Sequence, residues 1–116
     1  MQYMMLIYVD EKIEEARSEE AFNALFQAYT RFDEEGKAQN KIVSAAALQP
    51  TATATSLRIR DGKVLTTDGP FAETKEQLGG YYILECEDLD EAREWAARIP
   101  DAVNGTIEIR PKMVWG

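Results

Sequence analysis

The chain has 116 residues, of which 45% are hydrophobic and 29% are charged, and it carries a formal net charge of −8. This length and composition predict one folded domain over residues 1–116 and argue against disorder. The negative charge disfavours nucleic acid and anionic membrane surfaces as partners, because both carry charge of the same sign.

The sequence contains no histidine and a single cysteine, Cys86. Zinc, copper and non-haem iron sites of the usual ligand sets are thereby excluded, as are Ser-His-Asp and Cys-His nucleophiles. We expect no metal and no cofactor, with any acid–base chemistry performed by Asp, Glu, Lys, Tyr or Arg. The lone cysteine excludes an internal disulfide, and the apolar run at residues 3–9 is too short to cross a membrane and lacks a basic leader. We therefore expect a cytoplasmic protein.

The first half of the chain predicts a strand, a helix and a second strand. Residues 2–9 form a strand with two apolar faces, which indicates that both faces are covered. A loop at residues 10–12 precedes a helix that begins near Ser18, a suitable N-cap, and ends near Gly36. Residues 42–48 form the second strand. The apolar stripe of the helix has a spacing of three and four, and it comprises Phe22, Leu25, Phe26, Tyr29 and Phe32.

The middle of the chain predicts a hairpin and a further strand. Residues 52–60 and 63–67 read as two strands joined by an Asp-Gly turn, which is the strongest hairpin signal in the sequence. A loop follows, with a short helical turn at residues 74–78. It leads into a strand at residues 81–86.

The last part of the chain predicts a second helix and a final strand. The helix begins after Asp88, with Glu91 in a capping-box-like position, and Pro100 ends it. Residues 107–114 form the last strand. The buried stripe of this helix comprises Leu89, Ala92, Trp95, Ala96 and Ile99.

This order of elements predicts an α+β fold, a ferredoxin-like sandwich with the hairpin inserted midway. Two helices on one face of a largely antiparallel sheet leave the other face without a cover. Apolar side chains on that face favour a second copy packed against it, and therefore a homodimer. These side chains are Met4, Leu6, Tyr8, Tyr81 and Ile83.

Residues 68–85 read DGPFAETKEQLGGYYILE, a turn followed by dense charge, a Gly-Gly break and an apolar strand. This segment resembles the signature of the YCII-related (DGPF-domain) family. The resemblance extends to YMMLIY near the start, the LQPTATATSLRIRDGKV hairpin, the DLDEAREWAARIP helix and EIRP near the end. It implies a dimeric ferredoxin-like α+β barrel over nearly the whole chain, in agreement with the pattern of elements.

The resemblance also bears on function. The DGPF branch of the family has no established activity, and some of its members sit beside or are fused to extracytoplasmic-function sigma factors. The related YCII branch is linked to a His–Asp active site, and one relative removes chloride from a hydroxylated aromatic ring. The aspartate of the DGP motif corresponds to Asp68, whereas the histidine has no counterpart in this chain.

Asp68 is the candidate catalytic residue, and two interpretations of it are open. As a general acid or base, it would lie at the rim of a cleft between helix, sheet and dimer partner. As a turn residue, its carboxylate would bind backbone N–H groups ahead of Gly69 and Pro70.

Six further side chains are candidates for binding a small anionic or phenolic substrate. The lysine would hold Asp68 ionised, the arginines would clamp an anion, and the tyrosines and the glutamine would donate hydrogen bonds. Each also has a structural interpretation: a solvated surface for the lysine, cross-strand ion pairs for the arginines, buried hydroxyls for the tyrosines and a strand end for the glutamine. The six are Tyr8, Gln49, Arg58, Lys75, Tyr81 and Arg110.

Two functions of different classes follow from these residues. The first is a cofactor-free lyase or isomerase in which Asp68 moves a proton on a small substrate bound in the dimer cleft. The second is a non-enzymatic module that senses a small molecule or docks to a protein partner, such as an extracytoplasmic-function sigma factor. The sequence favours small-molecule binding and leaves catalysis open.

Overall fold

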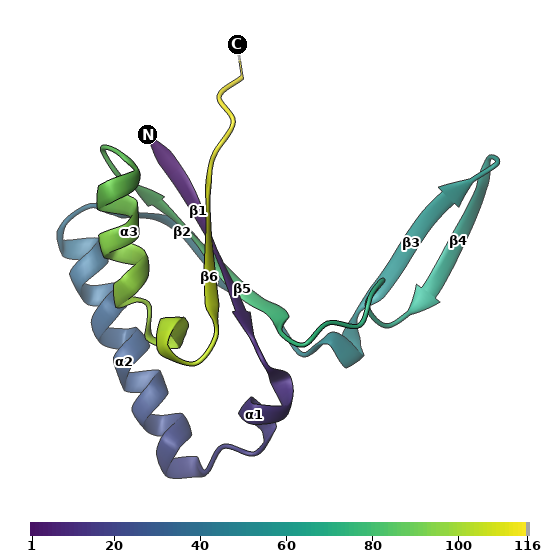
Figure 1. Ribbon diagram of the computed structural model, residues 1–116, viewed down its shortest axis with the longest axis horizontal. Coiled ribbons are helices and arrows are strands. Elements are labelled where there is room, and N and C mark those ends of the chain that lie inside the picture. Colours follow the sequence, from purple (N-terminus) through teal and green to yellow (C-terminus); the bar gives the residue numbers. More distant parts are fainter. Residues whose placement is uncertain (116) are drawn as a thin grey trace.

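The computed structural model describes residues 1–115, and a four-stranded antiparallel sheet forms the centre of the fold. Its strands lie in the order β2-β5-β1-β6 (Figure 1). A separate antiparallel ribbon is formed by β3 and β4. The strands are β1 (Gln2–Val9), β2 (Ile42–Ala47), β3 (Thr55–Arg60), β4 (Lys63–Asp68), β5 (Gln77–Glu85) and β6 (Thr106–Pro111).

Three α-helices accompany the sheet, which confirms the α+β class. The long helix α2 (Glu19–Ala38) and the shorter α3 (Leu89–Arg98) pack on one face of it, and α1 (Glu11–Glu15) follows β1 (Figure 1). Short 3-10 helices at Thr51–Thr53 and Pro100–Val103 follow β2 and α3. Within the described residues, no helix combines the length and the apolar character needed to cross a membrane.

The two apolar faces of β1 are buried to different extents, because the helices cover only one of them. Tyr3, Met5, Ile7 and Val9 are buried under the helices, whereas the side chains between them are half-buried on the opposite face, which bears no helix (Figure 1). The hydrophobic core therefore lies between the sheet and α2 and α3. It consists of Tyr3, Met5, Ile7, Val9, Phe32, Tyr82, Leu84, Cys86, Ala92, Trp95, Ala96 and Ile99.

Side-chain caps fix where the two longer helices begin. The Ser18 hydroxyl accepts a hydrogen bond from the Ala21 amide at 3.1 Å, and α2 begins at Glu19. The Asp88 carboxylate accepts one from the Glu91 amide at 2.9 Å, and α3 begins at Leu89. Both predicted N-caps are confirmed, because each satisfies an amide that the helix itself leaves without an acceptor.

The loop expected at residues 10–12 is wrong, because a short helix forms there. The Asp10 carboxylate accepts a hydrogen bond from the Lys12 amide at 2.9 Å and caps α1. The Glu11 carboxylate connects α1 to the 3-10 helix that follows β2. It accepts hydrogen bonds from the Thr51 amide at 2.8 Å and the Thr51 hydroxyl at 2.6 Å. One cap and one tertiary anchor thus sustain a single helical stretch that has no apolar periodicity.

Other predicted boundaries also differ from the structure, and the strand expected at residues 81–86 begins earlier, at Gln77. Residues 74–78 form no helical turn, because β5 already begins at Gln77 and pairs with Val9 of β1. The strand expected at residues 52–60 starts at Thr55, after the 3-10 helix. The last strand ends at Pro111 rather than at residue 114.

Some predicted core residues are exposed. Phe22 and Phe26, on the first half of α2, are 57% and 65% exposed, and Leu89 at the start of α3 is 44% exposed. The first half of α2 continues past α3, so that α3 does not lie beside it there (Figure 1). The prediction that Trp95 and Cys86 are core residues is confirmed, and burial raises the pKa of the Cys86 thiol.

The β3–β4 hairpin projects from the rest of the molecule as an arm, defined here as residues 55–68 (Figure 1). The predicted Asp-Gly turn is at its tip, where Asp61 and Gly62 have φ angles of 52° and 73°. The arm raises the radius of gyration to 16.3 Å, above the roughly 13 Å of a compact domain of this length. Its apolar side chains are exposed, and they are Leu57, Ile59, Val64 and Leu65.

Candidate functional site

A cavity of about 580 Å³ lies between α2 and the sheet, where α2 contributes side chains from Phe22 to Asp33. This volume is within the range of roughly 300–1,000 Å³ that is usual for small-molecule sites. Ile7, Val9 and Leu25 give it an apolar wall, and the end of β2 with Gln49 forms its rim. Gly80 lets β2 pass close to β5 here, because a Cβ would lie 2.7 Å from the Ala46 carbonyl oxygen.

Four polar side chains reach the cavity from three different elements. Tyr29 and Asp33 are four residues apart on α2 and therefore share one face of the helix. Tyr82 lies on the helix-covered face of β5. Asp101 is in the 3-10 helix that follows α3, and that helix brings it under α2.

These side chains form two tyrosine–carboxylate pairs. The Tyr29 hydroxyl donates to Asp101 Oδ2, and the Tyr82 hydroxyl donates to Asp33 Oδ1, each at 2.6 Å. Burial, together with the neighbouring carboxylate, raises the pKa of both tyrosines far above the usual value. Both hydroxyls therefore stay protonated and remain donors to their aspartates at neutral pH.

Asp101 is the most buried charged side chain of the site. Its exposed fraction is 5%, and Oδ1 has no hydrogen-bond partner among the described residues. A carboxylate oxygen without a donor is costly to bury. This oxygen is therefore the position in the cavity where a donor would be most stabilising.

Two glutamates complete the acidic lining of the cavity. Glu11 is engaged with Thr51, as described above. Glu14 lies 3.6 Å from Arg17 Nη1, and burial and the negative charge of Asp101 raise the pKa of its carboxyl. The part of the chain that the structure describes contributes four carboxylates to this lining and neither lysine nor arginine. No group of three or more His, Cys, Asp or Glu side chains in residues 1–115 is arranged to hold a metal ion.

The predicted catalytic residue lies outside this cavity. Asp68 is the last residue of β4, exposed at the base of the arm, where the Gly69 amide donates to the Ala54 carbonyl at 2.7 Å. Lys75 is exposed in the connection to β5, and the ion pairs within the described residues do not join it to Asp68. Asp68 as acid or base therefore stays a prediction.

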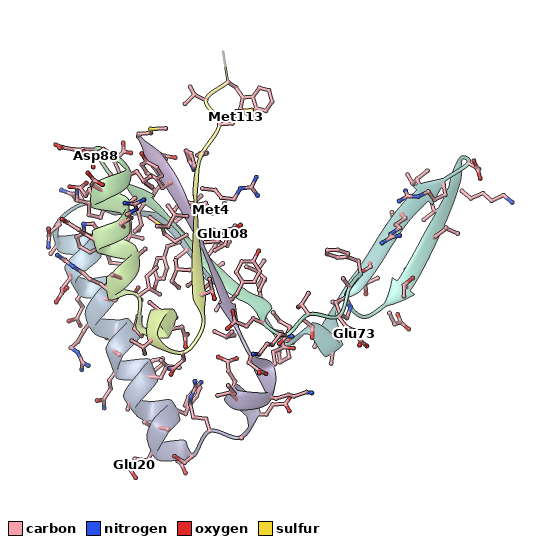
Figure 2. The ribbon with its side chains drawn as sticks, in the orientation of Figure 1. Met4, Glu20, Glu73, Asp88, Glu108 and Met113 are labelled. Carbon is pink, nitrogen blue, oxygen red and sulfur yellow. The ribbon has the colours of Figure 1, made fainter. Side chains whose placement is uncertain are left out.

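The other predicted binding residues are spread over three places. Arg58 is on the exposed arm, and Gln49 and Tyr81 contribute to the cavity lining. Tyr8 and Arg110 lie on the face without helices, where the Tyr8 hydroxyl is 3.5 Å from a carboxylate oxygen of Glu108. Figure 2 shows Met4 and Glu108 near one another on β1 and β6. Of the six predicted binding residues, the structure therefore brings only Gln49 and Tyr81 to the same cavity. The six do not form one site.

Four side chains of the cavity, those of Tyr29, Asp33, Tyr82 and Asp101, are not among the site residues that the sequence predicts. In the sequence, Tyr29 belongs to the apolar stripe of the helix. Its spacing of four residues from Asp33 is the one pattern that indicates a shared helix face for the two side chains. Asp101 follows a helix-ending proline, where an aspartate is ordinary, so its burial depends on the tertiary fold.

Two comparisons with known proteins complete the description. The YCII-related domain model matches residues 1–116 of the chain. The relative named Uncharacterized protein R00369, from Rhizobium meliloti (strain 1021), is 37% identical over 113 residues, which make up 96% of this chain and 91% of that protein.

Proposed function

Because the chain belongs to the YCII-related domain family, and its relative is described only as uncharacterized, we propose a function from the cavity itself: the protein binds a small organic molecule between α2 and the sheet. The observation that carries this proposal is the cavity, in which an apolar wall faces polar side chains from α2, β5 and the 3-10 helix. This combination of apolar surface and a few convergent polar groups is typical of small-molecule sites.

The lining favours a phenolic over an anionic ligand. Both classes were considered from the sequence, where arginines and Lys75 were the expected anion partners. Four carboxylates line the cavity and only Glu14 among them has an arginine, Arg17, as an ion-pair partner, so the lining would repel an anion. A phenol hydroxyl can instead donate to a carboxylate while its ring packs against Val9 and Leu25.

A thermal-shift screen of small phenols and other aromatic molecules tests this proposal. A ligand of the folded state at a hundredfold excess over its Kd stabilises it by about 2.7 kcal/mol. Ala45 lines the cavity and is opposite Tyr82 in the sheet, so Ala45→Phe should fill the cavity and abolish the shift. Ala97→Phe, on an exposed position of α3, is the matched control and should keep it. Shifts that survive Ala45→Phe would place the ligand elsewhere.

We further propose that the protein is a homodimer. Two apolar surfaces support this: the arm, and the sheet face without helices, where Leu6 lies beside Tyr81 and Met4 beside Ile83. The strand order β2-β5-β1-β6, with α2 and α3 on one face, supports a ferredoxin-like sandwich. A second copy packed on the other face would complete the dimeric barrel.

Excision of the arm tests the dimer. The hydrogen bond between Ala54 and Gly69 closes its base, so a two-residue turn can replace residues 55–68. We expect light scattering to give a dimer for the full chain at micromolar concentration and a folded monomer without the arm. Asp61→Asn at the tip is the control, because asparagine tolerates the positive φ there. A dimer that survives the excision would contradict a role for the arm.

Catalysis by Asp68 is a second, separate proposal. The residue lies outside the cavity of its own chain, so a cofactor-free lyase or isomerase would need the dimer to bring Asp68 to a substrate. Once a ligand is known, Asp68→Asn should abolish its conversion and leave its binding unchanged, whereas Asp61→Asn should affect neither. Conversion that persists in Asp68→Asn would remove this role.

The alternative function is a partner-docking module, such as one associated with an extracytoplasmic-function sigma factor. The exposed apolar arm is the observation that favours it, because single apolar residues are common on surfaces but clusters mark interaction sites. A full-length chain that is monomeric in the light-scattering experiment would leave the arm free and favour this alternative over the homodimer.

A further inference from the structure

The buried carboxylate of Asp101 lacks one of its hydrogen-bond partners. Oδ2 accepts from the Tyr29 hydroxyl at 2.6 Å, while Oδ1 has no donor among the described residues and the side chain is only 5% exposed. Asp101 also lines the cavity. A buried carboxylate needs compensating donors or a positive charge. The site is therefore incomplete without a donor at this oxygen.

The cavity lining is rich in acceptors and poor in donors. The hydroxyl hydrogens of Tyr29 and Tyr82 are already donated to Asp101 and Asp33. Glu14 adds another carboxylate, which pairs with Arg17, and in the described part of the chain the lining offers no lysine or arginine to neutralise Asp33 and Asp101. A ligand that carries a donor would satisfy this oxygen, and a cation would also match the charge of the site.

We propose that the ligand of this cavity presents a protonated amine to Asp101 Oδ1, an inference that rests on the small-molecule site proposed above. An ammonium group supplies three donors and one positive charge. Its apolar stem would lie against Ile7, Val9 and Leu25. A metal cation fits less well, because no group of three metal-ligating side chains is formed in residues 1–115.

Three probes with the same ring and different head groups test the inference: benzylamine, benzyl alcohol and benzoate. Titration of the isotope-labelled protein, followed by backbone amide NMR signals, gives the binding position and Kd of each. Benzylamine should bind about tenfold or more tighter than benzyl alcohol, because a charge-assisted hydrogen bond to a buried carboxylate exceeds a neutral one. Benzoate should bind weakest, and signals of the cavity-lining residues should move.

Variants separate the buried carboxylate from the overall charge of the protein. In Asp101→Asn the preference for benzylamine over benzyl alcohol should disappear. In Glu14→Gln, which removes a half-buried charge at the cavity, the preference should fall partly. Glu94→Gln removes the same charge from an exposed position of α3 and should leave it unchanged.

The possible outcomes distinguish this inference from the binding function on which it rests. If benzyl alcohol or benzoate binds in the cavity as tightly as benzylamine, the ligand is not an amine, and the cavity is still a small-molecule site. The same conclusion follows if the preference survives in Asp101→Asn. If no probe moves the signals of the lining residues, both proposals fail. Should Asp101→Asn not fold, the selectivity of the wild type and of Glu14→Gln decides the question.

Discussion

The two ends of the helix-covered sheet face are filled in different ways. Beside α3 the face is packed with aromatic rings: Phe32 meets Tyr82 at 4.9 Å and Trp95 at 6.0 Å between ring centroids, both edge to face. Toward the start of α2, from Asp33 back to Phe22, the same face borders the cavity of about 580 Å³. Tyr82 marks the boundary, because its ring belongs to the packed end and its hydroxyl to the cavity.

Helix length explains this difference. At 1.5 Å per residue, the 20 residues of α2 span about 30 Å and the 10 residues of α3 about 15 Å. Only the second half of α2 therefore has α3 as a neighbour, and the two helices together cover the sheet there. Beyond the end of α3, α2 faces the sheet together with α1 and the 3-10 helix at Pro100–Val103, and the cavity lies among them. The end beside α3 is therefore closely packed, and the other end contains the cavity.

Trp95→Ala should have the largest effect, because it opens a hole in the packed end. Trp95 is 3% exposed and contacts the Phe32 ring. We expect a loss of about 3–5 kcal/mol in the free energy of unfolding, measured by urea denaturation. Leu89→Ala, on the same helix at a position that is 44% exposed, should cost below about 1 kcal/mol. Equal losses for the two variants would contradict the contrast between the two ends.

The packed end is the part that sequence patterns predict well. The stripe of Ala92, Trp95, Ala96 and Ile99 follows the helical period, and all four are buried. The alternation along β1 likewise predicted the correct faces of the strand. Both patterns report regular elements packed against a full neighbour, which is the situation in which periodicity and burial coincide.

The end of the sheet face that borders the cavity follows no such pattern. Phe22 and Phe26 continue the apolar stripe of α2, yet both are exposed, because the helix extends beyond α3. Asp101 is buried although its sequence context is that of a turn. Which part of an apolar stripe is covered depends on the relative lengths of helices far apart in the chain, and local spacing carries no information about that.

Tyr29→Phe and Tyr82→Phe sharpen the comparison within the cavity. Tyr29→Phe removes the one side-chain donor to a carboxylate that is 5% exposed, so we expect a loss of about 1.5–3 kcal/mol in the free energy of unfolding. Tyr82→Phe removes the donor to Asp33, which is half-buried. Water can replace that donor, and the loss should be about 1 kcal/mol or less. Urea denaturation of the two variants gives the order, and the reverse order would indicate that Asp101 is not the more strongly desolvated group.

Glu14→Gln should change the free energy of unfolding least, and it should raise this free energy where the other variants lower it. Burial, and then the charge of Asp101, raise the pKa of Glu14, so the folded state disfavours its carboxylate. A folded-state pKa above the unfolded one stabilises the protein below the unfolded pKa, and this stabilisation is lost as the pH rises through the folded pKa. At pH 7 the wild type therefore carries a penalty that glutamine lacks, and Glu14→Gln should be slightly more stable.

The pH dependence distinguishes this cause from a general effect of net charge. At about pH 4 or below, near the usual pKa of a glutamate, Glu14 is protonated in the wild type and the advantage of Glu14→Gln should vanish. Glu15→Gln, an exposed neighbour on α1 outside the cavity lining, removes the same charge and should lack the advantage at pH 7. Urea midpoints of the three proteins at both pH values measure this. If Glu14→Gln were the less stable protein at pH 7, the stabilisation from the ion pair with Arg17 would exceed the cost of burying the Glu14 carboxylate. The cavity would then hold this carboxylate as favourably as water does.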